Sequence, residues 1–256
     1  TICSETMKTI LLMSLFIFAF AETGGANPNV PHYPADSFTA RDGTPFTITF
    51  FKHASLAIEV DGKSIYIDPV DGYAAYDLLP KADLVLITHS HYDHLDPKAI
   101  ARISTSETQI VCDKTSAQTL GPGCEVMPPG QTARPRPYAE IEAVRAYNTS
   151  QGHTQFHPRD REDNGYILKI GGTRIYIAGD SENTPEMKAL RNIDIAFLPV
   201  NQPYTMTVDQ AVDAVKAIRP AIFYPYHTGE TEVKTDLDRL HRELEGVTEI
   251  RIRPME

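Results

Sequence analysis

Short apolar segments of strand length recur along the chain, separated by polar or glycine-containing breaks. In the first half they occupy residues 46–51, 55–60, 64–69 and 83–88. Asp61-Gly62 separates the second from the third and is typical of a two-residue β-hairpin turn. The fourth segment, DLVLIT, is almost continuously apolar, which favours a strand covered on both faces. Asp96-Pro97 then predicts the start of a helix, because Asp is a good N-cap and Pro suits the first helical position.

The second half repeats this order of elements. Strands are expected at residues 140–147, 165–170, 173–180, 194–200 and 221–227, with a last strand at 249–254. Gly171-Gly172 predicts a second tight hairpin. Thr207 and Gln210 form a capping box that opens a helix. Residues 235–244 are expected to form another helix, with three leucines on one face.

Many strands joined by hairpins and interrupted by few helices indicate an α/β protein. We expect two packed sheets with helices outside, a four-layer αββα sandwich of two similar halves. The folded domain is predicted to span residues 45–256. The glycine- and proline-containing stretch 22–44 is interpreted as a flexible leader.

Residues 1–21 are interpreted as an upstream remnant followed by a secretory signal peptide. From Met7, one lysine precedes an apolar run at 10–20, and Ala19-Phe20-Ala21 resembles a cleavage site. The run is shorter than the roughly 20 residues that span a bilayer. An uncleaved anchor or a buried N-terminal helix are the alternatives. The hypothesis predicts a periplasmic or secreted protein without a stable membrane anchor after cleavage.

Charge and cysteine content narrow the classes of partner. The formal charge is 24 − 34 = −10, so the composition does not favour binding to nucleic acid or anionic lipid. Cys112 and Cys124 could pair in an oxidising compartment or remain two buried thiols. We expect a small-molecule substrate as the partner, and the oligomeric state stays open.

A cluster of metal-type side chains follows the segment 83–88. His89, His91, Asp93 and His94 lie within THSHYDHLDP. Alternate residues at a strand end point the same way, so His89 and His91 can share one ion, while the next two residues can face a second. Three imidazoles and a carboxylate suit zinc, with manganese or iron as alternatives.

Two later strands also end in metal-type donors. Asp180 follows a glycine at the end of TRIYIAGD, and His227 ends AIFYPYH. Each alone is typical of an ordinary turn aspartate or a half-buried histidine. Because strand ends on one edge of a sheet converge, the repetition indicates a shared site.

With these motifs the chain resembles the metallo-β-lactamase superfamily over nearly all of residues 45–254. THSHYDHLDP is similar to its H-x-H-x-D-H motif, AGD to its bridging aspartate and PYH to its last histidine. HASLAIE, IDP, NGYILKIGGTRIYIAGD and PYTMTVDQAV resemble the branch of lactonase-like metal-dependent hydrolases that includes ascorbate-6-phosphate lactonase. The resemblance implies the αββα sandwich and two divalent metal ions.

The resemblance also implies which residues hold each ion. One ion is expected at His89, His91 and a middle histidine, and the other at Asp93, His94 and His227, with Asp180 bridging. The middle histidine is expected at His157, which precedes a proline before the GY strand; His153 is the alternative.

Two further residues are candidates for the neighbourhood of the site. His53 is placed by the resemblance near the floor of the site, where a hydrogen-bonded core histidine is the favoured role. Tyr204 is a weak candidate for substrate binding, because aromatic residues at loop ends usually serve packing.

The expected activity is hydrolysis of an ester, lactone or phosphoester by hydroxide that two metal ions activate. Two divalent ions lower the pKa of a shared water to about 7, and Asp93 is expected to be both ligand and proton acceptor. The alternatives are an oxidoreductase that uses iron in the same fold and a non-catalytic metal-binding protein of the cell envelope. A nuclease of the same superfamily is disfavoured by the charge and the predicted export.

Overall fold

Two seven-stranded sheets form the centre of the molecule in the computed structural model, which describes residues 31–229 and 231–256. The first sheet has the order β1 (Ala35–Thr39), β2 (Pro45–Phe50), β3 (Leu56–Val60), β4 (Lys63–Ile67), β5 (Leu84–Leu86), β6 (Gln109–Cys112) and β7 (Glu125–Val126). The second has the order β14 (Glu249–Ile250), β13 (Ile222–Tyr226), β12 (Ile195–Pro199), β11 (Thr173–Ile177), β10 (Asn164–Ile170), β9 (Ala139–Arg145) and β8 (Thr132–Arg136). In each sheet the first four strands of the chain pair antiparallel and the later ones parallel.

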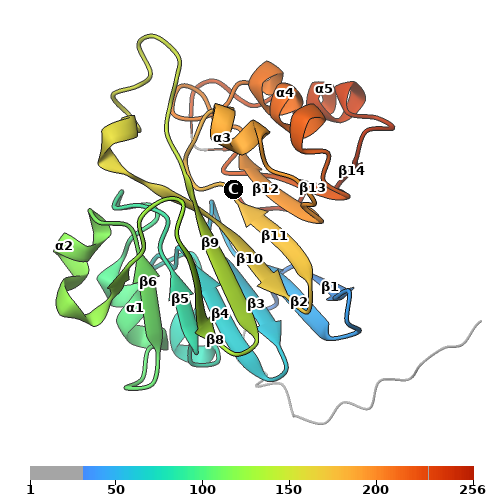
Figure 1. Cartoon of the computed structure of the whole chain (residues 1–256). Helices are drawn as coiled ribbons and strands as arrows, with labels where there is room; N and C mark the ends of the chain where they lie inside the picture. Colours follow the sequence, from blue (N-terminus) through green and yellow to red (C-terminus); the bar gives the residue numbers. More distant parts are fainter. Residues whose placement is uncertain (1–30, 230) are drawn as a thin grey trace, which may run out of the picture.

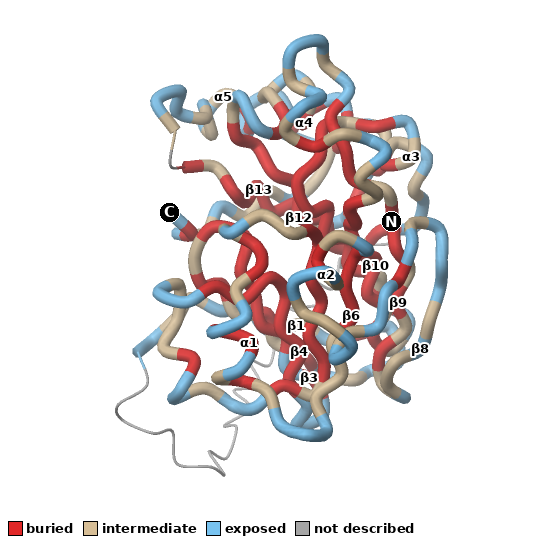
Figure 2. Tube along the Cα trace, turned by 90° about the vertical axis from the view of Figure 1, so that its left-hand side faces the viewer, coloured by how far each residue is buried: buried red, intermediate tan, exposed pale blue. Residues whose placement is uncertain are grey.

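The helices lie on the outer faces of the two sheets (Figure 1). They are α1 (Pro97–Ile103), α2 (Ser116–Leu120), α3 (Pro185–Lys188), α4 (Val208–Ile218) and α5 (Leu237–Glu243). One apolar core fills the space between the sheets, a second lies under α3 to α5, and a third lies under α1 and η1 (Tyr76–Leu78). The central strands, β3 to β5 and β10 to β13, are accordingly among the most buried parts of the trace in Figure 2, whereas β1, β7 and β8 at the sheet edges are more exposed. Three cores between four layers confirm the predicted αββα sandwich.

Local sequence explains the main turns and helix starts. Asp61 and Gly62 both have positive φ values, 51° and 70°, as a type I′ hairpin turn requires. The Asp96 side chain accepts a hydrogen bond from Lys98 N and so caps α1. Thr207 and Gln210 form the predicted capping box of α4.

The predicted flexible leader is wrong for its last ten residues. Residues 35–39 form β1, which pairs antiparallel with β2 from Ala35↔Thr49 to Thr39↔Pro45. Its sequence, ADSFT, holds one large apolar side chain, so its order comes from tertiary contacts that a local pattern does not show. The remnant and signal peptide proposed for residues 1–21 lie outside the described residues.

Other differences concern short elements. The short strands β6, β7 and β8 and the helices α2 and α3 were not predicted, and the last strand covers only Glu249–Ile250 rather than 249–254. Cys112 and Cys124 are free thiols whose Sγ atoms lie 2.7 Å apart. In the described part of the chain, no helix has both the length and the apolar character needed to cross a membrane.

Candidate metal centre

The site forms where the parallel strands of both sheets end. The chain leaves β5 into residues 88–94, leaves β11 into Asp180, and leaves β13 into His227. The turn between β2 and β3 of the first sheet contributes His53 to the same centre. Strands from both sheets therefore place side chains around one centre, as the repeated strand-end pattern predicted.

One group of four donors contains His89, His91, His157 and Asp180. His89 Nε2 lies 3.1 Å from His91 Nδ1, and His157 Nε2 lies 3.3 Å from Asp180 Oδ2. Their ligand atoms all lie within 4.8 Å of one another. An ion bound at about 2.0–2.2 Å from each donor fits such spacing. These are the residues expected for the first ion.

A second group contains His53, Asp93, His94 and His227. Asp180 reaches this group as well, with Oδ1 3.2 Å from His94 Nε2 and Oδ2 3.3 Å from His227 Nε2. Asp180 thus lies between the two groups, where a bridging carboxylate was expected. His53 is an addition to the expected set.

Several of these donors are buried without a hydrogen-bond partner among the described residues. They are His94 Nε2, His157 Nε2, His227 Nε2 and Asp180 Oδ1. Buried polar atoms are nearly always paired, so a convergent set of unpaired ones needs an explanation. Divalent cations at the two positions would satisfy all four atoms, and we conclude that the residues fit a dinuclear metal centre.

Asp68 orients two of the candidate ligands from behind. It lies 2.8 Å from His94 Nδ1, and its Oδ2 accepts a hydrogen bond of 2.6 Å from the Thr88 hydroxyl. The same hydroxyl lies 3.0 Å from His89 Nδ1. Both rings therefore turn Nε2 toward the site, as outer carboxylates commonly arrange for metal-binding histidines. The role of Asp68 was not predicted, and its position in IDP, directly after the buried strand β4, is the signal that the sequence holds for it.

The loop after β9 carries both candidates for the middle histidine, His153 and His157, and its conformation brings only His157 to the donor groups. His157 is buried, and its Nδ1 lies 3.1 Å from the Tyr204 carbonyl, so its Nε2 faces Asp180. His153 instead lies 3.5 Å from Glu182 and belongs to neither group. Glu182 fixes this loop by accepting backbone N–H bonds from residues 149 and 150.

Arg161 is a second neighbour of the ligands, and no motif in the sequence connects it with His91. Its Nη1 lies 2.8 Å from His91 Nε2, while Asp163 holds its guanidinium through Nε. The outer nitrogen of the His91 ring therefore contacts the Arg161 cation, whereas the outer nitrogen of the His94 ring contacts the Asp68 carboxylate.

The charges of the site favour a bound cation. Burial alone would raise the pKa values of Asp93 and Asp180, but neighbouring histidines outweigh it and hold both well below the usual range. Burial lowers the pKa of His89, and burial with Arg161 lowers that of His91 to about 4. At neutral pH the site thus offers ionised carboxylates at Asp93 and Asp180 and neutral imidazoles at His89 and His91, the forms that bind metals. His94 differs, because Asp180 and Asp68 outweigh burial and hold its pKa well above the usual range, so a metal ion that binds its Nε2 displaces a proton.

The backbone adopts unusual conformations at this centre. His53, Asp68 and His227 have φ values of 60°, 46° and 49°, which non-glycine residues rarely adopt. Gly179 has φ 63°, and a Cβ there would lie 2.6 Å from the Asn164 carbonyl oxygen. The glycine before Asp180 is therefore required by the close approach of the two backbone segments.

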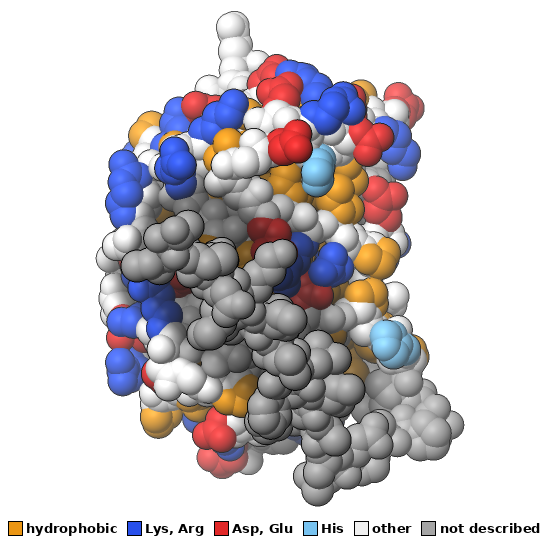
Figure 3. Space-filling view, turned by 90° about the vertical axis from the view of Figure 1, so that its right-hand side faces the viewer, with side chains coloured by type: hydrophobic (Ala, Val, Ile, Leu, Met, Phe, Trp, Pro, Cys, Tyr) orange, Lys and Arg blue, Asp and Glu red, His pale blue; other side chains and the backbone are white. Residues whose placement is uncertain are grey.

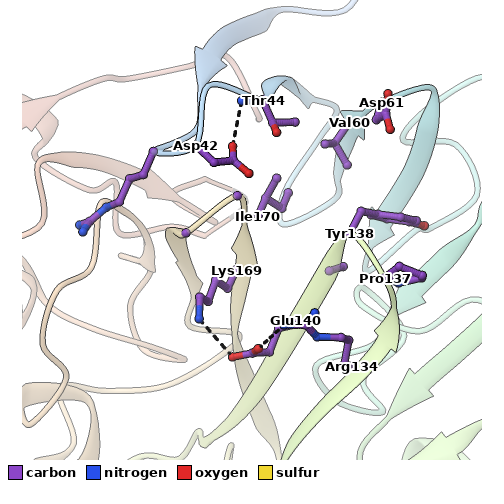
Figure 4. Close-up of a pocket in the computed structure, with 14 residues that line it drawn as sticks. Asp42, Thr44, Val60, Asp61, Arg134, Pro137, Tyr138, Glu140, Lys169 and Ile170 are labelled. Atoms are coloured by element: carbon purple, nitrogen blue, oxygen red, sulfur yellow. Dashed lines mark hydrogen bonds and ion pairs between the residues drawn. The ribbon is translucent and has the colours of Figure 1, made fainter.

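A cavity of about 540 Å³ opens beside the two groups. Its lining includes Tyr92, Phe156 and Tyr204 together with site residues. A cavity of about 610 Å³ lies at the opposite end of the sandwich, among the hairpin turns, and has no histidine in its lining. Figure 4 shows Glu140 of that cavity between Lys169 and Arg134, so the Glu140 carboxylate is already paired.

Comparisons with known proteins agree with this site. Residues 47–227 match the model of the family described as the beta-lactamase superfamily domain. The chain therefore belongs to the metallo-β-lactamase superfamily and is a metal-dependent hydrolase of that superfamily. A UPF0173 metal-dependent hydrolase from Flavobacterium johnsoniae is 33% identical over 193 residues, covering 70% of this chain and 83% of the relative.

Two solved structures show how far the likeness extends. A protein of Parabacteroides distasonis, named as a candidate metal-dependent hydrolase, is 50% identical with a TM-score of 0.83 and covers 88% of this chain and 100% of its own. A metallo hydrolase from Ignicoccus hospitalis is 25% identical with a TM-score of 0.67, covering 82% of this chain and 95% of its own.

Proposed function

We propose that the protein hydrolyses an ester, lactone or phosphoester bond of a small molecule at a centre of two divalent ions. The observation that carries this proposal is the convergence of two buried donor groups on Asp180 beside an open cavity. The resemblance to the lactonase-like branch supports the same reaction class.

The division of roles follows from the geometry. Two bound ions would supply hydroxide at neutral pH and polarise the oxygen of the scissile bond. Asp93 is partly exposed to the cavity, and Asp180 is buried between the groups. These positions support Asp93 as the residue that orients the attacking water and accepts its proton, and Asp180 as the ligand shared by the two metal positions.

The lining of the cavity narrows the substrate class. Among its described residues none is Lys or Arg. Phe156 packs edge-to-face against Tyr204 at 4.9 Å, and the Tyr92 side chain is exposed beside it. A neutral carbonyl ester or lactone with an apolar part fits such a wall better than a multiply charged phosphate. Tyr204 would contribute mainly this apolar surface.

Zinc is the proposed metal, because imidazole and carboxylate donors suit it. Manganese and iron use the same donors. Iron in the protein as purified, with a visible absorption band, would favour an oxidoreductase instead. Tight metal binding without turnover of any tested substrate would favour a non-catalytic envelope protein.

Export to the periplasm or the medium remains part of the proposal, as does a small-molecule rather than nucleic-acid partner. The apolar run after Met7 and the charge of −10 support these two points. On the face drawn in Figure 3, Lys and Arg side chains lie among Asp and Glu side chains. Cell fractionation of the full chain with a C-terminal tag would test export.

The decisive experiment is a substrate panel with zinc-loaded protein. We expect hydrolysis of lactones or carboxylic esters, weaker hydrolysis of phosphodiesters, and loss of both in Asp93→Asn. Absence of turnover on lactone, ester, phosphodiester and β-lactam panels, with two zinc ions bound, would contradict the proposed reaction.

A further inference from the structure

The two groups of donors are not equivalent. The first group has three histidines and the shared Asp180, and the Arg161 cation lies behind one of its rings. The second has three histidines, its own carboxylate at Asp93, and the same shared Asp180. The difference is the Asp93 carboxylate, and the third histidine of the second group is His53, a residue outside the H-x-H-x-D-H pattern.

We propose that His53 is an additional imidazole ligand of the second metal position, and that this position therefore binds the first divalent ion. The inference rests on the proposed two-metal site and concerns the order and strength of metal binding, not the reaction.

Distances support a direct ligand. His53 Nε2 lies 3.1 Å from Asp93 Oδ2, and that oxygen lies 4.0 Å from His227 Nε2. Neighbouring donors around an ion at 2.0–2.2 Å are separated by roughly 3–3.5 Å. The His53 ring is buried and its centroid lies 3.6 Å from that of His227. The two imidazoles and the Asp93 carboxylate are close enough together for a single cation to bind between them.

The backbone holds His53 in this place. Its φ of 60° is in the left-handed region, where a β-carbon is disfavoured. His53 N donates to the Met255 carbonyl at 2.5 Å, and the His53 carbonyl accepts from His227 N at 3.2 Å. The two histidines are thus joined through their main chains across the two sheets. Strained residues kept in place by their surroundings are typical of functional sites.

Charge makes the second position the stronger one. Asp93 and Asp180 face it, and Asp68 lies behind His94. The carboxylate of the first position is the shared Asp180, and the Arg161 guanidinium 2.8 Å from the outer nitrogen of His91 is itself paired with Asp163, so this pair adds little net charge. Coulomb attraction for a divalent ion is therefore larger at the second position.

The test uses metal-free full-length protein titrated with Co²⁺, whose visible spectrum reports the ligands. The main variant is His53→Asn, because Asn tolerates a positive φ but lacks the imidazole. The control is His153→Asn, the same substitution near the site but outside both donor groups. We expect His53→Asn to weaken binding of the first Co²⁺ at least tenfold and to change its absorption bands, and His153→Asn to leave both unchanged.

A second variant tests whether His53 acts as a metal ligand or has only a structural role. His53→Gly accepts the same backbone conformation and leaves a ring-sized space. Added imidazole should restore the wild-type Co²⁺ spectrum in this variant. First-ion affinity within twofold of wild type in His53→Asn, or a Co²⁺ spectrum unchanged by the substitution, would overturn the proposal. Failure of the substrate panel with this metal binding intact would contradict only the proposed function.

Discussion

At the scale of single residues, the site contains two kinds of side chain. The sequence motif identifies the candidate ligands, but it does not identify the residues that hold those ligands in place. The histidines and aspartates of THSHYDHLDP are obvious candidates from their types and spacing. Asp68 and Arg161 lie behind the ligands and set the orientation and charge of the rings. Their partners are distant in the chain, so only tertiary structure reveals these contacts.

Replacing Asp93 tests the assignment of the proton acceptor. Asp93→Asn keeps the size of the side chain but removes its charge, so turnover is expected to fall by about 10²–10⁴. Circular dichroism should show the wild-type fold, and metal analysis should show how much metal is retained. Near wild-type turnover on the best substrate would contradict the role of Asp93.

The identity of the middle histidine can be read from metal content alone. His157→Ala removes a buried donor that faces Asp180, so we expect the protein to bind one zinc ion less. His153→Ala, its matched control, should keep the wild-type content because His153 contacts Glu182 instead. The opposite result would exchange their roles.

Asp68→Asn tests the support behind the ligands. The amide cannot accept from the Thr88 hydroxyl and His94 as the carboxylate does, so both candidate ligand rings lose their fixed orientation. Loss of such a partner typically costs about 10–100-fold in metal affinity. Equilibrium dialysis with zinc measures this loss, and unchanged affinity would show that Asp68 has only a structural role.

At the scale of elements, β1 shows how a weak local pattern becomes ordered. Asp36 in β1 accepts two hydrogen bonds from Arg253 Nη2, at 2.8 and 2.7 Å, and one from the Tyr224 hydroxyl. Tyr224 belongs to β13 of the other sheet, so a single carboxylate joins the first strand to the opposite sheet. No periodicity in residues 35–39 could have predicted this contact.

Asp36 also gives a prediction for pH. Burial alone would raise its pKa, but hydrogen bonds from Tyr224 and Arg253 outweigh it and lower the pKa below 3.8. A lowered folded-state pKa means that the stabilisation is complete above about pH 4 and is lost as pH falls through the folded value. Asp36→Asn should lower the free energy of unfolding by about 1–3 kcal/mol at pH 7.

Urea unfolding at several pH values measures this effect. The difference between wild type and Asp36→Asn is expected to shrink below pH 4, while the exposed control Glu245→Gln stays close to wild type at pH 7. A difference that is constant across this range would indicate that the carboxylate charge is not the cause.

At the scale of the whole molecule, the metal centre connects the two sheets. His53 and His89 come from the first sheet, and Asp180 and His227 from the second. Ions bound here would therefore resist separation of the sheets as well as act in catalysis.

Metal removal should accordingly destabilise the entire fold. An ion present at 100 times its dissociation constant stabilises the folded state by about 2.7 kcal/mol. For a domain of this size, chelation is then expected to lower Tm by about 5–10 °C. Differential scanning calorimetry before and after chelation and zinc readdition tests this, and an unchanged Tm would show that the centre is not coupled to global stability.

The sequence by itself determined the layered fold and the main ligands. Continuous apolar runs, hairpin pairs such as Asp61-Gly62 and the capping box at Thr207 are local signals, and local geometry dictates what they form. The motif after β5 likewise places its donors by strand alternation alone.

Tertiary structure alone decided the rest. It ordered β1 through Asp36, brought His157, which the resemblance already favoured over His153, to Asp180, and placed His53 beside Asp93. Each of these depends on contacts between segments far apart in the chain. These contacts are stabilised by burial and by charge where the two sheets meet. A local sequence pattern does not show which distant segments will come into contact there.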